Sequence, residues 1–352
     1  MIVIDKMKCR NIIVMKKYFA IYLVLLLLFP VAPCFSQNHS SDKLLAKKYY
    51  EEAKETAAKE MVSYYATERT VRKFISLYHA ASDKNAAIST AWLNRAIFHS
   101  ALKEYDQSFV VLDSARMYAS NTTEKRYIDL YYGYILEEKG DSAEAMKYYN
   151  KALEQALKTY GSFEPSLPIA IDIWECMLPA KGVDVAEEYF LNYLSKIKGI
   201  SEKEKESWSK LATRPVARVM GRKWYIHSKA ADVYVVSESE MEELRLVDKF
   251  YRSFRDEVEK DTRDMRGVID GSLSDELIKK ASSDYSLIWG ADIKELKANS
   301  PAGMVILKRE DAGWYEVKYY KGEYASVVDV HVARIGSELR IDEIIRKENE
   351  TK

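Results

Sequence analysis

Cysteine is nearly absent from this sequence: only three occur among 352 residues. Cys9 and Cys34 lie within the first 36 residues, which leaves Cys176 as the one cysteine of the remaining chain. One thiol cannot form an intramolecular disulfide, so the fold has to rest on its hydrophobic core. Cys176 lies in the apolar run Ile173–Leu178, a setting that favours a buried core thiol over a nucleophile.

Glycine and proline are also scarce, with 13 and 7 residues respectively. Few turn formers favour long helices over a turn-rich β-sandwich. Hydrophobic residues make up 47% of the chain, which is enough to bury real cores and excludes a disordered protein. Tyrosine is abundant, at 26 residues, and it packs between helices while keeping a polar tip that suits protein interfaces.

The short motifs of known catalytic chemistry are missing. The sequence contains no zinc-protease, phosphate-loop, dinucleotide-loop or nucleophile-elbow motif, and no pair of Cys-x-x-Cys. None of its five histidines has a histidine partner at the i,i+4 spacing of a metal site: His39, His79, His99, His227 and His331. We therefore predict a protein with no metal, no cofactor and no catalytic residues.

Charge of either sign is not in excess, with 54 basic and 54 acidic residues. The first 36 residues hold five of the basic residues and one of the acidic ones, so residues 37–352 carry a net charge of −4. A mildly acidic chain offers no surface that neutralises phosphates, which excludes nucleic acid as an expected partner.

Residues 1–36 have the pattern of a secretory signal peptide. Lys16 and Lys17 precede the apolar run Tyr18–Phe29, and small residues follow up to Ser36. We expect cleavage near Ser36 and export to the periplasm or cell envelope. An uncleaved anchor is the first alternative, although the run is shorter than the roughly 20 residues of a membrane span. A lipoprotein attached through Cys34 is the second, and only then is membrane association expected.

Helical periodicity dominates residues 44–213, where apolar residues recur at spacings of three and four. Two segments within this range also share a pattern of small and large residues at intervals of 12, 4 and 3. The first consists of Ala96, Ser108, Leu112 and Ala115, and the second of Gly133, Ala145, Tyr149 and Ala152. Antiparallel helices approach closely where small side chains meet, and a large residue one turn on fills the gap beside them.

This pattern resembles the tetratricopeptide repeat, a helix–turn–helix unit of about 34 residues. Trp92, Tyr105 and Leu136 also fall on positions of that family, and Gly140-Asp141 on its interhelical turn. The resemblance implies an all-α repeat array over residues 37–213. Weaker units flank the two matching ones, and Pro179 is expected to shorten one of their helices.

The resemblance also implies a concave groove, lined by the first helix of each unit, that holds a protein or peptide partner. The groove candidates are Leu93, Ile97, Ser100, Tyr127, Leu130, Tyr134, Glu137 and Glu138. They include no lysine or asparagine, which disfavours the family's clamp on a C-terminal carboxylate. The alternative is that Tyr127, Tyr131 and Tyr134 pack between repeats, as aromatic residues at helical spacing usually do.

The character of the chain changes after Arg214-Pro215. Residues 214–238 read as a linker or β segment, and residues 239–352 as an α+β domain in which helices pack on a curved antiparallel sheet. A helix capped by Ser237 or Ser239 comes first, and a second one follows over residues 273–282. Alternation then predicts strands near residues 304–307, 314–320, 325–335 and 339–345. This order resembles the nuclear-transport-factor-two-like, or cystatin-like, cone.

The third of these strands contains one pair of residues suited to acid–base chemistry. Asp329 and His331 share one face, while Val328, Val330 and Val332 share the other. If the polar face lined the cone, Asp329 could act as a general base near Tyr315, and the protein would be an isomerase-like or dehydratase-like enzyme. Strict alternation favours the opposite arrangement, with the valines in the core and the polar pair in solvent. We therefore favour an exported binding or scaffold protein.

Overall fold

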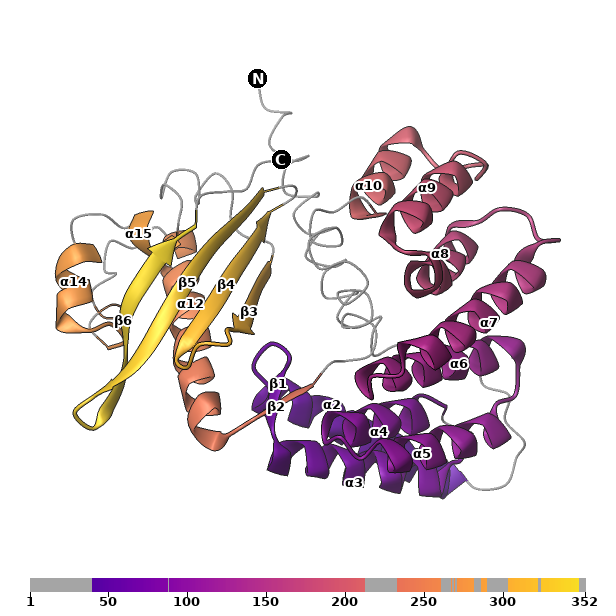
Figure 1. The fold of residues 1–352 in the computed structure, drawn as a ribbon, viewed down its shortest axis with the longest axis horizontal. Helices are drawn as coiled ribbons and strands as arrows, with labels where there is room; N and C mark the ends of the chain where they lie inside the picture. The colour runs from indigo at the N-terminus through magenta and orange to yellow at the C-terminus, as the bar shows by residue number, and fades with distance from the viewer. Residues whose placement is uncertain are drawn as a thin grey trace. The chain divides into compact units, whose positions relative to one another are not determined.

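The computed structural model describes residues 40–87, 89–212, 233–260, 267, 269, 271–281, 286–289, 303–321 and 324–347. The expected signal peptide with Cys34 lies outside the described residues, as does most of the segment 214–238. The chain divides into two compact units (Figure 1). Of the described residues, the helical unit contains 40–60 and those from Glu68 to Val235, and the C-terminal unit contains Met61–Thr67 and those from Val236 onward.

The helical unit is a succession of α-helices in which each helix packs against the next one along the chain. The helices are α2 (Ser40–Glu60), α3 (Glu68–Lys84), α4 (Ser89–Ala101), α5 (Tyr105–Tyr118), α6 (Thr122–Glu138), α7 (Ser142–Tyr160), α8 (Leu167–Lys181), α9 (Val183–Leu194) and α10 (Glu202–Ala212). Asn121 and Asp141 begin α6 and α7, because their side chains accept hydrogen bonds from the N–H groups of Glu124 and Glu144. The expected helical half is thereby confirmed.

Pro179 does not shorten α8, contrary to the expectation. The helix continues to Lys181, and Gly182, with φ 89°, follows it. Proline removes one backbone donor, and the helix continues past this loss to Lys181. A glycine that adopts positive φ without strain is the stronger signal for the end of the helix.

The small residues of the two similar segments lie where helices touch. An ideal Cβ atom on Gly133 would lie 2.6 Å from the Tyr149 ring, closer than real Cβ atoms come to any neighbour. One unit earlier, the Ser108 hydroxyl donates to the Ala96 carbonyl oxygen at 2.9 Å, and both residues are fully buried. The spacing of small residues therefore reports close helix contacts.

We expect Gly133→Leu to destabilise the helical unit by about 1–3 kcal/mol, because the new side chain overlaps the Tyr149 ring. The measurement is the free energy of unfolding by chemical denaturation. Adding Tyr149→Ala makes room for the leucine, so the double variant should recover part of the loss. Strictly additive losses would contradict a direct contact between these two positions.

The C-terminal unit combines helices with a four-stranded antiparallel sheet of order β3-β4-β5-β6. Its strands are β3 (Gly303–Lys308), β4 (Trp314–Lys321), β5 (Tyr324–Ile335) and β6 (Glu338–Arg346), and its helices are α12 (Glu238–Lys260), α14 (Asp275–Ala281) and α15 (Ser286–Trp289). Two short strands, β1 (Tyr65–Thr67) and β2 (Tyr234–Val236), form a separate sheet. Figure 1 shows α12 crossing one face of the four-stranded sheet.

Two details of this unit refine the expectation. Ser237 is the cap of α12, since its hydroxyl accepts the N–H of Glu240 and the Glu240 carboxylate accepts the N–H of Ser237. The helix expected from Leu273 begins instead at Asp275, because Leu273 forms a parallel bridge with Ile341 of β6. At Leu273 the backbone pairs with the sheet, although the sequence pattern predicts a helix there.

One face of the sheet packs on α12. The apolar stripe of α12 is fully buried and includes Phe250 and Phe254. The sheet supplies the residues Ile306, Tyr315, Val317, Val328, Val330, Val332, Ile341 and Ile344. In β6, Ile341 and Ile344 both face this core although they are three residues apart, which a register shift beside His331 makes possible.

Candidate functional site

Most groove candidates line the interior of the helical unit. Leu93, Ile97, Ser100, Leu130 and Tyr134 are buried, with at most 8% of their surface exposed. Of the remaining candidates, Tyr127 and Glu137 are half-buried, and Glu138 is exposed. Leu93, Ile97, Leu130 and Tyr134 belong to the hydrophobic core of the helical unit, and the expected partner groove stays a prediction. When neighbouring helices pack on both sides of a helix, they bury residues that would otherwise be exposed on its open face.

Tyr127 belongs to a polar cluster that joins three helices. Its hydroxyl donates to Asp172 of α8 at 2.7 Å and lies 3.2 Å from Glu175. Arg126, beside it on α6, donates to Asp172 at 2.5 Å and lies 3.3 Å from the hydroxyl of Tyr160 at the end of α7. The Tyr160 hydroxyl also donates to Asp172. One carboxylate therefore ties three successive helices together.

Arg126 is fully buried in this cluster, which is unusual for a charged side chain. Burial alone would lower its pKa, but the negative charge of Asp172, together with the interactions of Cys176 and Tyr160, raises the pKa above the ordinary value of arginine. The guanidinium also lies over the rings of Tyr127 and Tyr160, at 5.6 and 5.2 Å. The guanidinium occupies the faces of both rings, and the cluster connects α6, α7 and α8. Its role is therefore structural. We call Arg126, Tyr127, Tyr160 and Asp172 the clasp.

Asp129, one turn along α6, forms a second buried centre. Its carboxylate is fully buried and accepts from Arg116 at 2.5 Å, from Lys151 at 3.1 Å and from Gln155 at 3.2 Å. Neither Asp129 nor Arg126 belongs to a sequence motif that predicts its role. The available signal was position, because both lie three or four residues from Leu130 or Gly133 and so share the inward face of α6.

An aromatic stack crosses α5, α6 and α7 beside these charges. The Phe109 ring stacks on Tyr132 with 5.7 Å between centroids, and Tyr132 stacks on Tyr148 with 5.0 Å. Each ring also has a cation over it, from Lys139, Arg116 and Lys151 respectively. The stack fixes the side of α5 that carries Phe109, and the Tyr132 hydroxyl also donates to Asp113 of α5.

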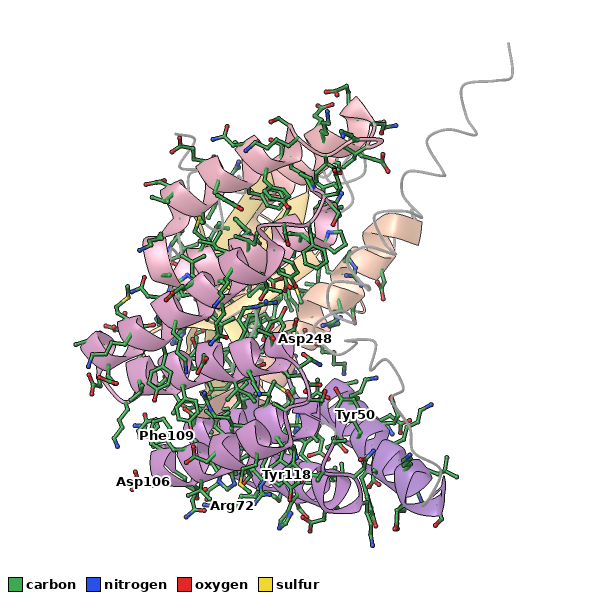
Figure 2. All side chains as sticks on the ribbon, turned by 90° about the vertical axis from the view of Figure 1, so that its right-hand side faces the viewer. Tyr50, Arg72, Asp106, Phe109, Tyr118 and Asp248 are labelled. Carbon is green, nitrogen blue, oxygen red and sulfur yellow. The ribbon has the colours of Figure 1, made fainter. Side chains whose placement is uncertain are left out.

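Three exposed large hydrophobic residues lie on α5. Val110 is 58% exposed, Met117 81% and Tyr118 51%. Asp106 and Asp113 share one stripe with Val110 and Met117, since residues 106, 110, 113 and 117 follow the i, i+4, i+7, i+11 spacing of one helix face, and Tyr118 lies beside this stripe, about 100° further around the helix. We call these five residues the α5 face. Figure 2 labels Asp106, Phe109 and Tyr118 in this part of the helical unit.

Tyr118 gives the α5 face a rigid end. Its ring stacks on Trp92 of α4 with 5.8 Å between centroids, and the Trp92 indole N–H donates to the Ala86 carbonyl oxygen. An exposed tyrosine held against a buried tryptophan loses little freedom when a partner covers it. The face therefore combines flexible Met117 with a fixed aromatic ring.

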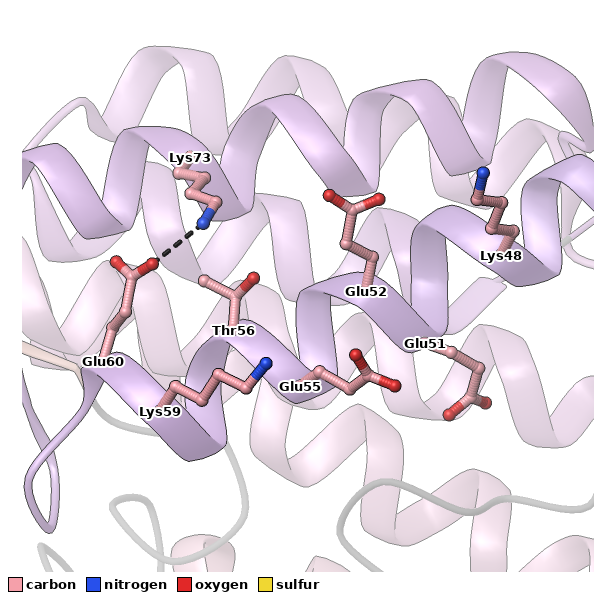
Figure 3. A pocket seen from close by; sticks show the side chains of 8 residues that line it. All are labelled: Lys48, Glu51, Glu52, Glu55, Thr56, Lys59, Glu60 and Lys73. Atoms are coloured by element: carbon pink, nitrogen blue, oxygen red, sulfur yellow. Dashed lines mark hydrogen bonds and ion pairs between the residues drawn. The ribbon is translucent and has the colours of Figure 1, made fainter.

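A hollow of about 530 Å³ along α2 is polar throughout (Figure 3). Its lining consists of Lys48, Glu51, Glu52, Glu55, Thr56, Lys59, Glu60 and Lys73. Lys73 donates to Glu60 at 2.8 Å, and this hydrogen bond lowers the pKa of the Glu60 carboxyl. Small-molecule pockets are lined mainly by hydrophobic and aromatic side chains, and this hollow has none.

The polar pair of β5 lies on the sheet face opposite the valines, as alternation predicts. Val328, Val330 and Val332 are buried, and the side chains of Asp329 and His331 are 17% and 27% exposed. The pair is more covered than expected because each residue has a partner. Arg309 donates to both oxygens of Asp329 at 2.8 and 2.9 Å.

Asp329, His331 and Tyr315 do not come together in the acid–base arrangement that was the alternative to a solvent-facing pair. His331 bonds Asp342 at 2.7 Å and packs on Trp314 with 4.9 Å between ring centroids. Tyr315 pairs with Val330 across the strands and points to the opposite face, where its hydroxyl donates to Glu243 at 2.6 Å. Burial raises the pKa of Tyr315, and the carboxylate of Glu243 raises it further. Tyr315 is therefore a core residue.

Other features of the described residues bear on metal binding, membrane insertion and thiol chemistry. They include no cluster of three or more histidine, cysteine or acidic side chains that could hold a metal ion. No described helix has the length and apolarity to cross a membrane. The single described cysteine, Cys176, is buried. Comparison with protein families, with curated proteins and with solved structures finds no match to this chain.

Proposed function

We propose that this protein is an exported, non-catalytic binding or scaffold protein that captures a protein partner on the α5 face. The observation that carries the proposal is the exposure of Val110, Met117 and Tyr118 on one helix side. Exposed apolar residues gathered on one side and rimmed by polar residues are typical of protein contact surfaces. Methionine and tyrosine are also enriched in such surfaces.

In this proposal the helical unit is a tetratricopeptide-like array and the C-terminal unit resembles the nuclear-transport-factor-two-like cone. The paired helices and the close contact of Gly133 with Tyr149 support the first assignment. Helices on one face of an antiparallel sheet support the second. The partner surface differs from the expected groove, because the groove positions are largely buried. Export rests on the sequence pattern of residues 1–36.

The competing proposal, a small-molecule enzyme in the C-terminal unit, has less support. Its acid and base would be Asp329 and His331, and both are already engaged by Arg309 and Asp342. A general base must reach a substrate proton, which a carboxylate with both oxygens held by one guanidinium does poorly. The binding proposal needs no rearrangement of such groups.

The test is capture of partners from the native envelope fraction by the full chain. We expect the double variant Val110→Asp, Met117→Asp to lose at least about tenfold in capture, since two carboxylates would have to be desolvated in the contact. The control variant, Leu44→Asp with Leu157→Asp, changes two exposed leucines on other helices and should capture as the unaltered chain does. Equal capture by both variants would rule out the α5 face.

A further inference from the structure

Met61–Thr67 connects two helices of the helical unit but packs into the C-terminal unit. Val62 and Tyr65 are 7% and 6% exposed and belong to the hydrophobic core of the C-terminal unit. Between them the backbone makes a tight turn, in which each residue's N–H donates to the carbonyl oxygen of the other, at 3.1 and 2.9 Å. We call Met61–Thr67 the strap.

The strap covers the edge of the sheet at β3. The Ser63 hydroxyl accepts the N–H of Ile306 at 3.2 Å, and the Tyr65 hydroxyl accepts the N–H of Lys308 at 2.7 Å. Residues two apart on a strand point their N–H groups to the same side, here the side away from β4. Side-chain oxygens therefore occupy two of the donors that a further strand would use.

The other edge of the sheet is closed by the backbone. Ser274 donates its N–H to the Ile341 carbonyl oxygen at 2.8 Å, and Ile341 donates its N–H to Ser272 at 2.9 Å. Residues 272–274 thus supply a short strand-like partner to β6. At β3 the cover comes from a segment more than 200 residues away, and the two bonds named above come from side-chain hydroxyl groups.

We propose that the strap is a built-in cap on the β3 edge, which prevents this edge from pairing with β3 of a second copy of the chain. An uncovered edge strand is a template for pairing with another chain. Two identical edges related by a two-fold axis pair antiparallel, and that contact closes on itself as a dimer. Ser63 adopts φ 52°, a conformation rare for residues other than glycine, which places its hydroxyl at the edge.

The test removes only the two hydroxyl groups, in the full chain carrying Ser63→Ala and Tyr65→Phe. We expect hydrogen exchange of the peptide spanning β3 to speed up by about fivefold or more, because two edge amides lose their acceptors. We also expect a dimer that grows with protein concentration in light scattering. A control variant with Ser114→Ala and Tyr118→Phe makes the same chemical changes on α5 and should alter neither result.

A third variant adds Lys308→Pro to the two hydroxyl changes. Proline on an edge strand removes the donor without breaking the ladder to the inner strand, so this variant should return to a monomer. Unchanged exchange at β3, or a dimer that persists with Pro at position 308, overturns the proposal. An equal rise of exchange across β4, β5 and β6 overturns it as well, because the hydroxyls would then support the whole domain.

Discussion

Replacing Asp172 with alanine is expected to destabilise the helical unit by about 3–5 kcal/mol, the cost of leaving a buried charge without its partner. Arg126 keeps no exposed surface, and Asp172 is the carboxylate it donates to at 2.5 Å. The same carboxylate accepts from the hydroxyls of Tyr127 and Tyr160, which lose it together. The measurement is the midpoint and free energy of unfolding, with a drop in midpoint of roughly 10 °C.

A second variant separates the cost of the broken pair from the value of the intact one. Arg126→Met combined with Asp172→Leu replaces both charges by apolar groups of similar length, and such exchanges are often neutral or stabilising. We expect the double variant to be considerably more stable than Asp172→Ala alone. If both variants are destabilised equally, Arg126 and Asp172 do not act as a pair, and packing of α8 alone explains the loss.

The order of elements in both units could be predicted from the sequence, because periodicity reports which face of an element is buried. The alternation of Val328, Asp329 and Val330 predicted the two faces of β5, and burial confirms it. The 12-4-3 spacing likewise located the contact of Gly133 with Tyr149. These patterns are local, so a single sequence contains them in full.

The groove and the clasp could not be predicted in the same way. Arg126 and Asp172 are 46 residues apart, and nothing in the sequence of either helix names the other as its partner. Leu130 and Tyr134 occupy positions where the resemblance implies an open surface, but neighbouring helices cover them. Exposure depends on which helices pack on both sides, and local periodicity does not state this.

The strap is the clearest case of information that is not local. Seven residues between two helical patterns read as an ordinary loop of the helical array, the range to which the sequence analysis assigned them. In the structure Val62 and Tyr65 contribute to the core of the C-terminal unit. The sequence contains only a weak signal for this. Val62 and Tyr65 are apolar, whereas an exposed loop between two helices needs no apolar side chains.

The largest effect in the C-terminal unit is expected from Val330→Asp, which should prevent this unit from folding. Val330 has no exposed surface and lies between Tyr315 of β4 and Ile344 of β6 in the sheet register. The residues of the cluster around it are hydrophobic, so the carboxylate would be buried in apolar surroundings, at a cost of several kcal/mol. That cost is a large part of the 5–15 kcal/mol that stabilises a typical domain.

The control is Ile335→Asp in the same strand, where the side chain is 51% exposed and the change should cost less than about 1 kcal/mol. Hydrogen exchange of the β3–β6 peptides distinguishes the two variants, since Val330→Asp should remove protection from all four strands while α4–α9 keep theirs. Retained protection in the Val330→Asp variant would show that β5 can shift its register and turn the new carboxylate outward.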